Sequence, residues 1–402
     1  MMAWKKYTVE QLIDLDMLEA PMDGNHGSIH PKASDYVLTG VPFIMVNDMP
    51  NGHVDLKNCA FISGKQAGTL RKGFAKPGDV LLSHKATIGR TAIVPNDFDT
   101  IILTPQITYY RVKKGIDNRF LKYYFDSPNF QILFNNWAGS GSTRAYLGIT
   151  AQRKLPIILP ELDEQIKIAD ILSNFDKKID KNNEINNNLE QQAQAIFINE
   201  FLSLKTLPDG WKQSNLIDIA DYLNGLAMQK YRPTGAEIGI SVLKIRELRQ
   251  GFCDNNSELC SPNIKSEYII HDGDVIFSWS GSLLVDFWCG GICGLNQHLF
   301  KVTSSKYDKW FYYAWTKHHL DRFISVAADK ATTMGHIKRD ELGKAEVFIP
   351  NESDYSRIEA LLQPIYDLII SNRIENKKLA SLRETLLPKL ISGELDVSDI
   401  DL

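Results

Sequence analysis

Apolar residues recur at alternating spacings of four and three residues in two long stretches of the chain. This heptad spacing is typical of helices that pack along a common seam. The seam positions are Ile168, Leu172, Phe175, Ile179, Asn182, Asn186, Leu189, Ala193 and Ile196, and then, always 190 residues later, Ile358, Leu362, Ile365, Ile369, Asn372, Asn376, Leu379, Arg383 and Leu386. A 3.5-residue repeat cannot absorb an insertion without rotating its apolar stripe, so the constant offset predicts two long helices that pack on each other.

Two neighbouring seam layers are polar in both predicted helices. An unpaired buried amide costs about 1–3 kcal/mol, so these asparagines need partners. An antiparallel pair in which Asn182 faces Asn376 and Asn186 faces Asn372 satisfies all four amides. Polar layers of this kind fix the register of a coiled coil. Pro364 predicts a kink or a late start in the second helix, because an interior proline removes a helical hydrogen bond.

The globular parts that precede the two stretches repeat each other. The matched landmarks are Trp4-Lys5 with Trp211-Lys212, Gly40 with Gly239, the Gly-Asp-Val motif at Gly78 with that at Gly273, and Pro160 with Pro350. The offset falls from 207 at the tryptophans to 190 at the prolines, which indicates short deletions in loops of the second copy. We therefore expect a globular domain at 1–160, a spacer helix at 161–203, a second globular domain at 204–350 and a second spacer helix at 351–402.

Composition narrows the class of protein further. A chain of 402 residues suits two or three domains. No apolar run approaches the roughly 18 residues that a membrane span needs, and the first residues lack the apolar core of a signal peptide. Five cysteines, without a Cys-x-x-Cys spacing, fit reduced thiols better than disulfides or a zinc site. We expect a cytoplasmic protein that has no membrane partner and no metal.

The charge is unevenly distributed along the chain, whose net charge is -4. Lys and Arg outnumber Asp and Glu by 18 to 13 in residues 1–160 and equal them, 17 to 17, in 204–350. The helical regions 161–203 and 351–402 are acidic, with 4 against 9 and 6 against 10. Attraction to phosphate is a local matter, so nucleic-acid binding stays open, although the total charge does not indicate it.

The order of motifs resembles a known family. Each module begins with Trp-Lys and Leu-Ile-Asp and continues with a Gly-Asp-Val strand that ends in serine; the first module closes with PIILPELDEQIKIADIL from Pro156, and the chain with LLPKLISGEL from Leu386. The whole chain is similar in this order to the specificity subunit of Type I restriction-modification systems. The second copy departs from the pattern at Asn351, where NESDYSRIEALL lacks the Glu-Gln pair.

The resemblance implies an α+β fold and a role in DNA recognition. Two similar target recognition domains, each a mixed β-sheet with helices, would be separated by two long helices that form an antiparallel coiled coil with pseudo-two-fold symmetry. Each domain would read one half of a bipartite site in double-stranded DNA, and about 30 seam residues would hold the domains about 45 Å apart. The helices would dock methyltransferase subunits and a restriction endonuclease subunit. S-adenosylmethionine and ATP are expected on those partners, and no cofactor on this chain.

Candidate readers are polar, basic and aromatic residues in predicted loops, since base edges are reached by side chains that project into a groove. Arginines suit bidentate contacts to guanine, and lysines suit phosphate. In the first domain the candidates are Ser83, His84, Lys85, Thr87, Arg90, Ser142, Thr143, Arg144 and Tyr146. In the second they are Lys244, Arg246, Ser278, Trp279, Ser280, Ser282, Lys330, Thr332, Thr333 and His336. A solvated surface side chain is the alternative for each.

The sequence lacks the motifs of phosphate-binding loops and of methyltransferase sites. GSGST at Gly139 lacks the lysine of a phosphate-binding loop, and no Asn-Pro-Pro-Tyr-like motif or glycine-rich S-adenosylmethionine loop is present. We therefore expect a chain that binds and does not catalyse. Two other classes stay open: a cryptic DNA-modifying enzyme, either a nuclease or a methyltransferase with a divergent centre, and a coiled-coil scaffold whose globular ends bind other proteins.

Overall fold

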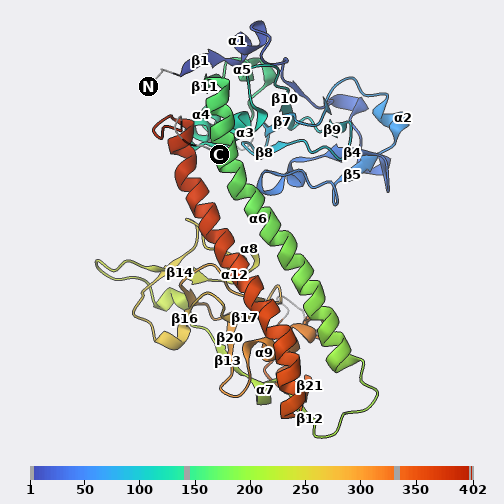
Figure 1. Cartoon of the computed structure of the whole chain (residues 1–402), viewed down its shortest axis with the longest axis vertical. Coiled ribbons are helices and arrows are strands. Elements are labelled where there is room, and N and C mark those ends of the chain that lie inside the picture. Colours follow the sequence, from blue (N-terminus) through green and yellow to red (C-terminus); the bar gives the residue numbers. More distant parts are fainter. Residues whose placement is uncertain (1–3, 140–144, 330–335, 398–399, 401–402) are drawn as a thin grey trace. The chain divides into compact units, whose positions relative to one another are not determined.

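The chain forms two compact units (Figure 1). Unit 1 contains Met1–Lys177 and Ser381–Leu402, and unit 2 contains Lys178–Ala380. The fold is known from a computed structural model, which describes residues 4–139, 145–329, 336–397 and 400. The boundaries after Lys177 and Ala380 lie within the two stretches that were predicted to be spacer helices.

Both long helices are present. Helix α6 runs over Leu162–Phe197 and continues into a π-helical turn at Ile198–Leu202, and helix α12 runs over Glu352–Ile391. Because α12 already begins at Glu352, the late start expected at Pro364 is wrong. Leu362 and Tyr366, which flank this proline, are buried in the core of unit 2, and this packing offsets the lost hydrogen bond. Within the described residues no helix has the length and apolarity that crossing a membrane requires.

The strands described in unit 1 form three sheets. The first sheet is the antiparallel pair β1 and β11. The second sheet is fully antiparallel and has the strand order β2-β10-β7-β8. The third sheet has the order β3-β5-β4-β9-β6 and contains the parallel pair β4 and β9. The strands are β1 (Lys5–Thr8), β2 (Met22–Asp23), β3 (Tyr36–Val37), β4 (Val41–Ile44), β5 (Ala60–Ile62), β6 (Phe74–Ala75), β7 (Val80–Ser83), β8 (Thr91–Ile93), β9 (Ile101–Leu103), β10 (Ile107–Tyr110) and β11 (Pro156–Leu159). The short helices are α1 (Val9–Asp14), α2 (Gly64–Ala67), α3 (Asn118–Asp126), α4 (Pro128–Trp137) and α5 (Ile149–Gln152).

Unit 2 repeats this topology, except that its mixed sheet has no counterpart of β3 among the described residues. Its sheets are β12-β21, the antiparallel β13-β20-β17-β18, and β15-β14-β19-β16, in which β14 and β19 are parallel. The strands are β12 (Lys212–Asn215), β13 (Asp221–Asn224), β14 (Ile240–Leu243), β15 (Leu259–Cys260), β16 (Ile269–Ile270), β17 (Val275–Ser278), β18 (Leu284–Phe287), β19 (Cys293–Leu295), β20 (Leu299–Thr303) and β21 (Glu346–Ile349). The short helices are α7 (Leu216–Ile219), α8 (Ile245–Gln250), α9 (Lys309–His318), α10 (Leu320–Asp329) and α11 (Asp340–Gly343).

The repeated Gly-Asp-Val motif is a turn that starts β7 in unit 1 and β17 in unit 2. Each is an inner strand of its four-stranded antiparallel sheet, and we call it the central strand. Gly78 and Gly273 both have positive φ angles, 85° and 86°, which glycine adopts without a steric penalty. In both copies the following aspartate accepts a hydrogen bond from a backbone N–H three residues earlier, and Asp79 also binds Arg111 at 2.8 Å. The motif therefore has a structural role at the start of β7 and of β17.

Each central strand is buried on both faces. In unit 1, Val80 belongs to a core that includes helix α3, whereas Leu81 faces the core beneath the mixed sheet. In unit 2, Val275 and Ile276 divide in the same way between two cores. Burial on both faces leaves the two ends of the strand as the positions where side chains can reach solvent.

In unit 2, the segments of α6 and α12 pair in the antiparallel register expected from the asparagine layers. Asn182 donates from Nδ2 to Oδ1 of Asn376 at 2.8 Å, and Asn372 donates from Nδ2 to Oδ1 of Asn186 at 2.9 Å. Asn182, Asn186 and Asn372 are all at least 92 % buried. Buried amides thus satisfy each other across the seam, as the cost of an unpaired amide requires.

Replacing Asn186 with alanine is expected to lower the free energy of unfolding of unit 2 by about 1–3 kcal/mol, because the buried amide of Asn372 loses its acceptor. The exposed neighbour Asn187 provides the matched control, since the same substitution there removes no buried partner. Urea unfolding of both variants measures the difference. Replacing Asn186 and Asn372 together with leucine should recover most of the loss; equal stability of the two alanine variants would contradict this account.

Candidate nucleic-acid interface

In unit 1, the loop that follows β7 is tied to a segment distant in sequence. The N–H of Leu147 donates to the carbonyl of His84, and that of Ala86 to Ala145, both at 3.0 Å. Lys85 and Tyr146 form an isolated antiparallel bridge. We call residues 84–90 with 145–147 the loop pair of unit 1. It lies at the opposite end of β7 from the Gly-Asp-Val turn.

Unit 2 has an equivalent loop pair, which we define as residues 279–283 with 336–338. The N–H of Ile337 donates to the carbonyl of Trp279 at 3.1 Å, and Ser280 and His336 form the antiparallel bridge. In both units the bridge begins two residues after the serine that ends the central strand. The backbone arrangement is therefore repeated, whereas the side chains that it presents differ.

Four candidate readers of unit 1 are exposed on this loop pair. Lys85, Thr87 and Arg90 are exposed, and Tyr146 is 50 % exposed. Nζ of Lys85 lies 5.9 Å from the centre of the Tyr146 ring, a cation–π distance. Arg90 donates one N–H to the carbonyl of Val46 at 3.0 Å, which fixes the direction of the side chain while its guanidinium has further donors to offer.

Ser83 and His84 are buried beneath the loop pair. The hydroxyl of Ser83 accepts from the N–H of Arg90 at 2.8 Å and closes the base of the loop. His84 donates from Nδ1 to the carbonyl of Leu147 at 3.0 Å, and burial lowers its pKa, so the ring is neutral and Nε2 carries the lone pair. Nε2 is buried and has no hydrogen-bond partner among the described residues. Both side chains hold the loops together in the free chain.

The loop pair of unit 2 presents aromatic and basic groups. Trp279 is half-buried among the rings of Phe300, His298 and His336, at 5.7 to 6.2 Å between centres, and donates from Nε1 to Oδ1 of Asn224 at 3.0 Å. His336 is exposed, as are Lys338 and Arg339, two cations that the sequence interpretation did not select. Ser278 and Ser280 are buried and joined by a hydrogen bond of 3.2 Å, and Ser282 is half-buried.

A polar cluster beside His84 was also missed from the sequence. Asp23, at the end of β2, is 4 % exposed, lies 2.7 Å from Nε2 of His26 and forms an ion pair with Lys72. Burial acts to raise the pKa of Asp23, but the hydrogen bonds from Lys72 and His26 lower it overall, so the carboxylate is charged. The sequence feature that could have indicated this cluster is Gly24, which follows β2 as Gly225 follows β13. A side chain at either glycine would collide with a neighbouring backbone carbonyl.

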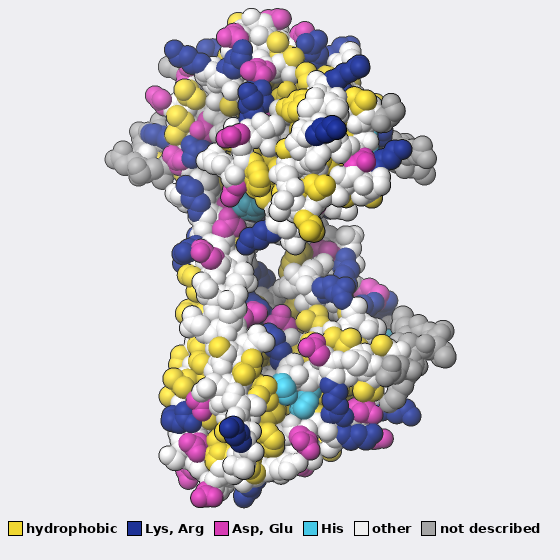
Figure 2. Space-filling view, turned by 90° about the vertical axis from the view of Figure 1, so that its right-hand side faces the viewer, with side chains coloured by type: hydrophobic (Ala, Val, Ile, Leu, Met, Phe, Trp, Pro, Cys, Tyr) yellow, Lys and Arg dark blue, Asp and Glu magenta, His cyan; other side chains and the backbone are white. Residues whose placement is uncertain are grey.

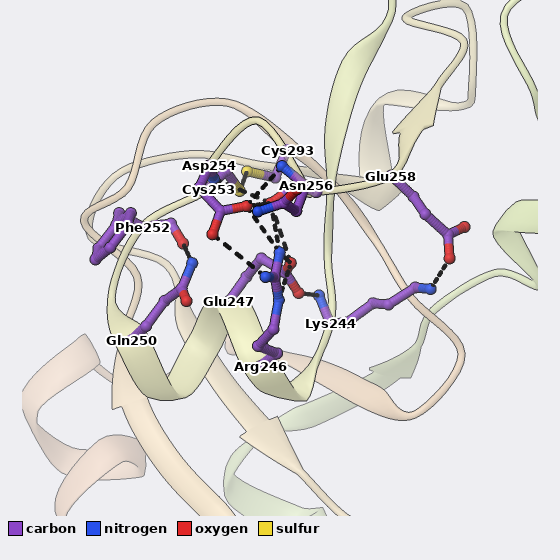
Figure 3. A network of polar contacts seen from close by, with 11 residues as sticks. Lys244, Arg246, Glu247, Gln250, Phe252, Cys253, Asp254, Asn256, Glu258 and Cys293 are labelled. Carbon is purple, nitrogen blue, oxygen red and sulfur yellow. Dashed lines mark hydrogen bonds and ion pairs between the residues drawn. The ribbon is translucent and has the colours of Figure 1, made fainter. Parts of the chain in front are cut away.

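Lys244 and Arg246 belong to an intrachain ion-pair network (Figure 3). The ammonium of Lys244 binds Glu258, and the guanidinium of Arg246 binds Glu247 at 2.6 Å and Asp254 at 2.9 Å. The hydrogen bond to Glu247, followed by that to Asp254, raises the pKa of Arg246. Either cation would have to exchange carboxylates for phosphate or a base edge to contact DNA.

Six further candidate readers come from two other segments of the sequence. Ser142, Thr143, Arg144, Lys330, Thr332 and Thr333 lie outside the described residues. On the face drawn in Figure 2, Lys and Arg side chains are interspersed with Asp and Glu, so that face has no single basic field. No group of three or more His, Cys, Asp or Glu side chains in the described part of the chain could hold a metal ion. The described arrangement therefore suits contacts by individual side chains of the two loop pairs.

Comparison with known proteins gives a consistent result. The family model for the Type I restriction modification DNA specificity domain matches residues 3–191 and again residues 208–383. The two matches correspond to the two copies seen in the sequence and in the sheet topology. Together they cover most of the chain.

Individual relatives agree with the family match. The chain is 27% identical over 350 residues to the MjaIX specificity subunit of a Type I restriction enzyme from Methanocaldococcus jannaschii, covering 80% of this chain and 79% of the relative. It is 21% identical to the HindI specificity subunit from Haemophilus influenzae, over 88% of this chain and 94% of the relative. The crystal structure of a Type I S subunit from M. genitalium has a TM-score of 0.58 at 14% identity and covers 96% of both chains. That likeness supports the fold.

Proposed function

The chain belongs to the family of Type I restriction modification DNA specificity domains, and from this we propose that it is the DNA-reading subunit of a Type I restriction-modification complex. The loop pair of unit 1 reads one half of a bipartite target in double-stranded DNA, and the loop pair of unit 2 reads the other half. The observation that carries the proposal is the repeated bridge, Lys85 with Tyr146 and Ser280 with His336, which presents different side chains on the same backbone frame.

The side chains on each loop pair suit different contacts. Lys85 suits a phosphate, and Arg90 suits the O6 and N7 acceptors of guanine, because a guanidinium can donate in parallel to both. Trp279 and His336 offer ring faces and edges to bases, and Lys338 suits a phosphate of the DNA backbone. Two half-sites with different sequences follow naturally from two frames with different side chains.

Methylation and cleavage of the DNA are assigned to the partner subunits. Methyltransferase subunits, which would use S-adenosylmethionine, and a restriction endonuclease subunit, which would use ATP, dock on the long helices. Leu361 and Leu368 of α12 support such docking, since they lie one heptad apart and are 44 % and 45 % exposed. The chain itself acts by binding, so purified chain incubated with S-adenosylmethionine and duplex DNA is expected to leave the DNA unmodified.

Exchange of one half of the chain provides the test. Cells that carry this chain with its methyltransferase partners should show methylated adenine in both halves of a split motif. Replacing residues 1–155 with the corresponding segment of another family member should change one half of the motif and keep the other. Genome-wide mapping of methylated adenine measures both. A continuous motif, or a change in both halves, would contradict the proposal, and exchange of residues 204–350 serves as the reciprocal control.

A further inference from the structure

Two thiols meet beside the ion-pair network of unit 2 (Figure 3). Cys253 follows helix α8, which Gly251 caps in a left-handed conformation, and Cys293 begins strand β19. Their Sγ atoms are 3.4 Å apart and are hydrogen-bond partners, although 40 residues separate them in sequence. Both cysteines are free. The fold thus brings together two reduced thiols that the sequence does not pair.

The surroundings of the two thiols differ. The hydrogen bond from Cys293 is the largest influence on Cys253 and lowers its pKa; burial opposes this, while the hydroxyls of Ser241 and Ser257 add to it. The carboxylate of Glu247 acts in the opposite direction. The pKa of Cys293 is raised, first by its hydrogen bond to Cys253 and then by burial. Cys293 is 1 % exposed and Cys253 is partly exposed, so a small reagent can reach Cys253 first.

The other cysteines have environments that disfavour reaction. Burial raises the pKa of Cys59 and of Cys289 to about 11, and burial also raises the pKa of Cys260. Thiols of this kind are protonated near neutral pH and react slowly, because the thiolate is the nucleophile. Cys253 is therefore distinguished by its partial exposure and by a second thiol within contact distance.

We propose that Cys253 and Cys293 form a peroxide-sensitive dithiol, in which Cys253 is the thiol oxidised first and Cys293 the resolving thiol. The thiolate of Cys253 attacks hydrogen peroxide, an S–O bond forms as the O–O bond breaks, and hydroxide leaves; the sulfur becomes a sulfenic acid. Cys293 then loses its proton and attacks that sulfur, the S–O bond breaks, and water leaves as the disulfide forms. One peroxide is reduced to two waters as the two thiols become one disulfide.

Little movement is needed for the second step. A disulfide requires the two sulfur atoms to approach by about 1.4 Å from their present separation, which side-chain rotation and a small loop adjustment can supply. The new bond would tie the segment after α8 to β19. That segment carries Asp254 and Ser257, which contact Arg246 and Glu247, so oxidation would hold this network in its present arrangement.

Treatment of the reduced full-length chain with excess hydrogen peroxide provides the test. We expect the intact mass to fall by two hydrogen atoms and a non-reducing peptide map to show the Cys253–Cys293 linkage. Reducing agent should reverse both. A linkage that involves Cys260 or Cys289, or a chain that keeps all five thiols under conditions that oxidise glutathione, would overturn the proposal. Because these measurements use the unaltered chain, they do not depend on how a variant folds.

Serine variants assign the two roles. In C293S the sulfenic acid on Cys253 should persist and be captured by dimedone at that residue, with no disulfide. In C253S neither product should form at Cys293. C289S is the matched control, since it removes a buried thiol of unit 2 and should leave the linkage intact. Capture of dimedone at Cys293 in C253S, to the extent seen at Cys253 in C293S, would contradict the assigned order.

Discussion

Replacing Arg373 with alanine is expected to lower the free energy of unfolding of unit 2 by about 2–3 kcal/mol, because two carboxylates lose their shared partner. Arg373, on α12, donates to Asp286 of β18 at 2.6 Å and to Glu190 of α6 at 2.8 Å. The three side chains are 26 to 35% exposed, so the loss should fall short of that for a fully buried pair. Although burial opposes the charge of Arg373, Asp286 and the other acidic neighbours raise its pKa overall.

Lys378 supplies the matched control for this measurement. It is an exposed cation on the same helix, and its replacement with alanine should change stability by less than about 0.5 kcal/mol. Tryptophan fluorescence during urea unfolding is a suitable probe, since five of the seven tryptophans belong to unit 2. If R373A and K378A unfolded at the same urea concentration, the ion pairs of Arg373 would add nothing to the stability of unit 2.

The seam could be predicted from the sequence because its information is local and periodic. The asparagine layers and the constant offset define one antiparallel register, and the structure has that register in unit 2. One layer of the predicted seam was not explained by the pattern, because it places Arg383 opposite Phe175. In the structure Arg383 binds Asp176, which also accepts a hydrogen bond of 2.5 Å from the hydroxyl of Tyr123. The partner that completes this layer comes from α3, and no periodicity could indicate it.

The loop pairs were only partly predictable. Repetition located the serine that ends each central strand, but polarity alone does not reveal burial, so Ser83, His84, Ser278 and Ser280 were selected although they are buried. The Gly-Asp-Val motif, the clearest repeated signal, belongs to a turn at the other end of the strand. Arg246 has its acidic partners close in sequence, and their presence could have shown that its charge is already used. The matched glycines 24 and 225 could have located the Asp23 cluster.

Removal of the Lys85 ammonium is expected to weaken binding of the assembled complex to duplex DNA to a similar extent for all sequences. A lysine that contacts one phosphate releases about one counterion on binding, so K85A should make the dependence of log affinity on log salt shallower by about 0.9. Arg90 should behave differently: if it donates to guanine, R90A costs about 1–3 kcal/mol for the correct half-site and little for a substituted one. Titrations at several salt concentrations, with both half-sites varied in turn, separate the two effects.

The control for Lys85 lies at the other end of the same sheet. Lys114 is exposed and follows the C-terminal end of β10. The loop pair lies at the other end of this strand, because the backbone N–H of His84 donates to the carbonyl of Gln106, just before β10 begins. Because K114A removes the same charge from the same unit, general attraction to DNA predicts equal losses for the two variants. Contact through the loop pair predicts a shallower salt slope for K85A alone, and specificity for the second half-site should be unchanged in both. An equal effect of K114A would remove the reason for assigning DNA contact to this end of β7.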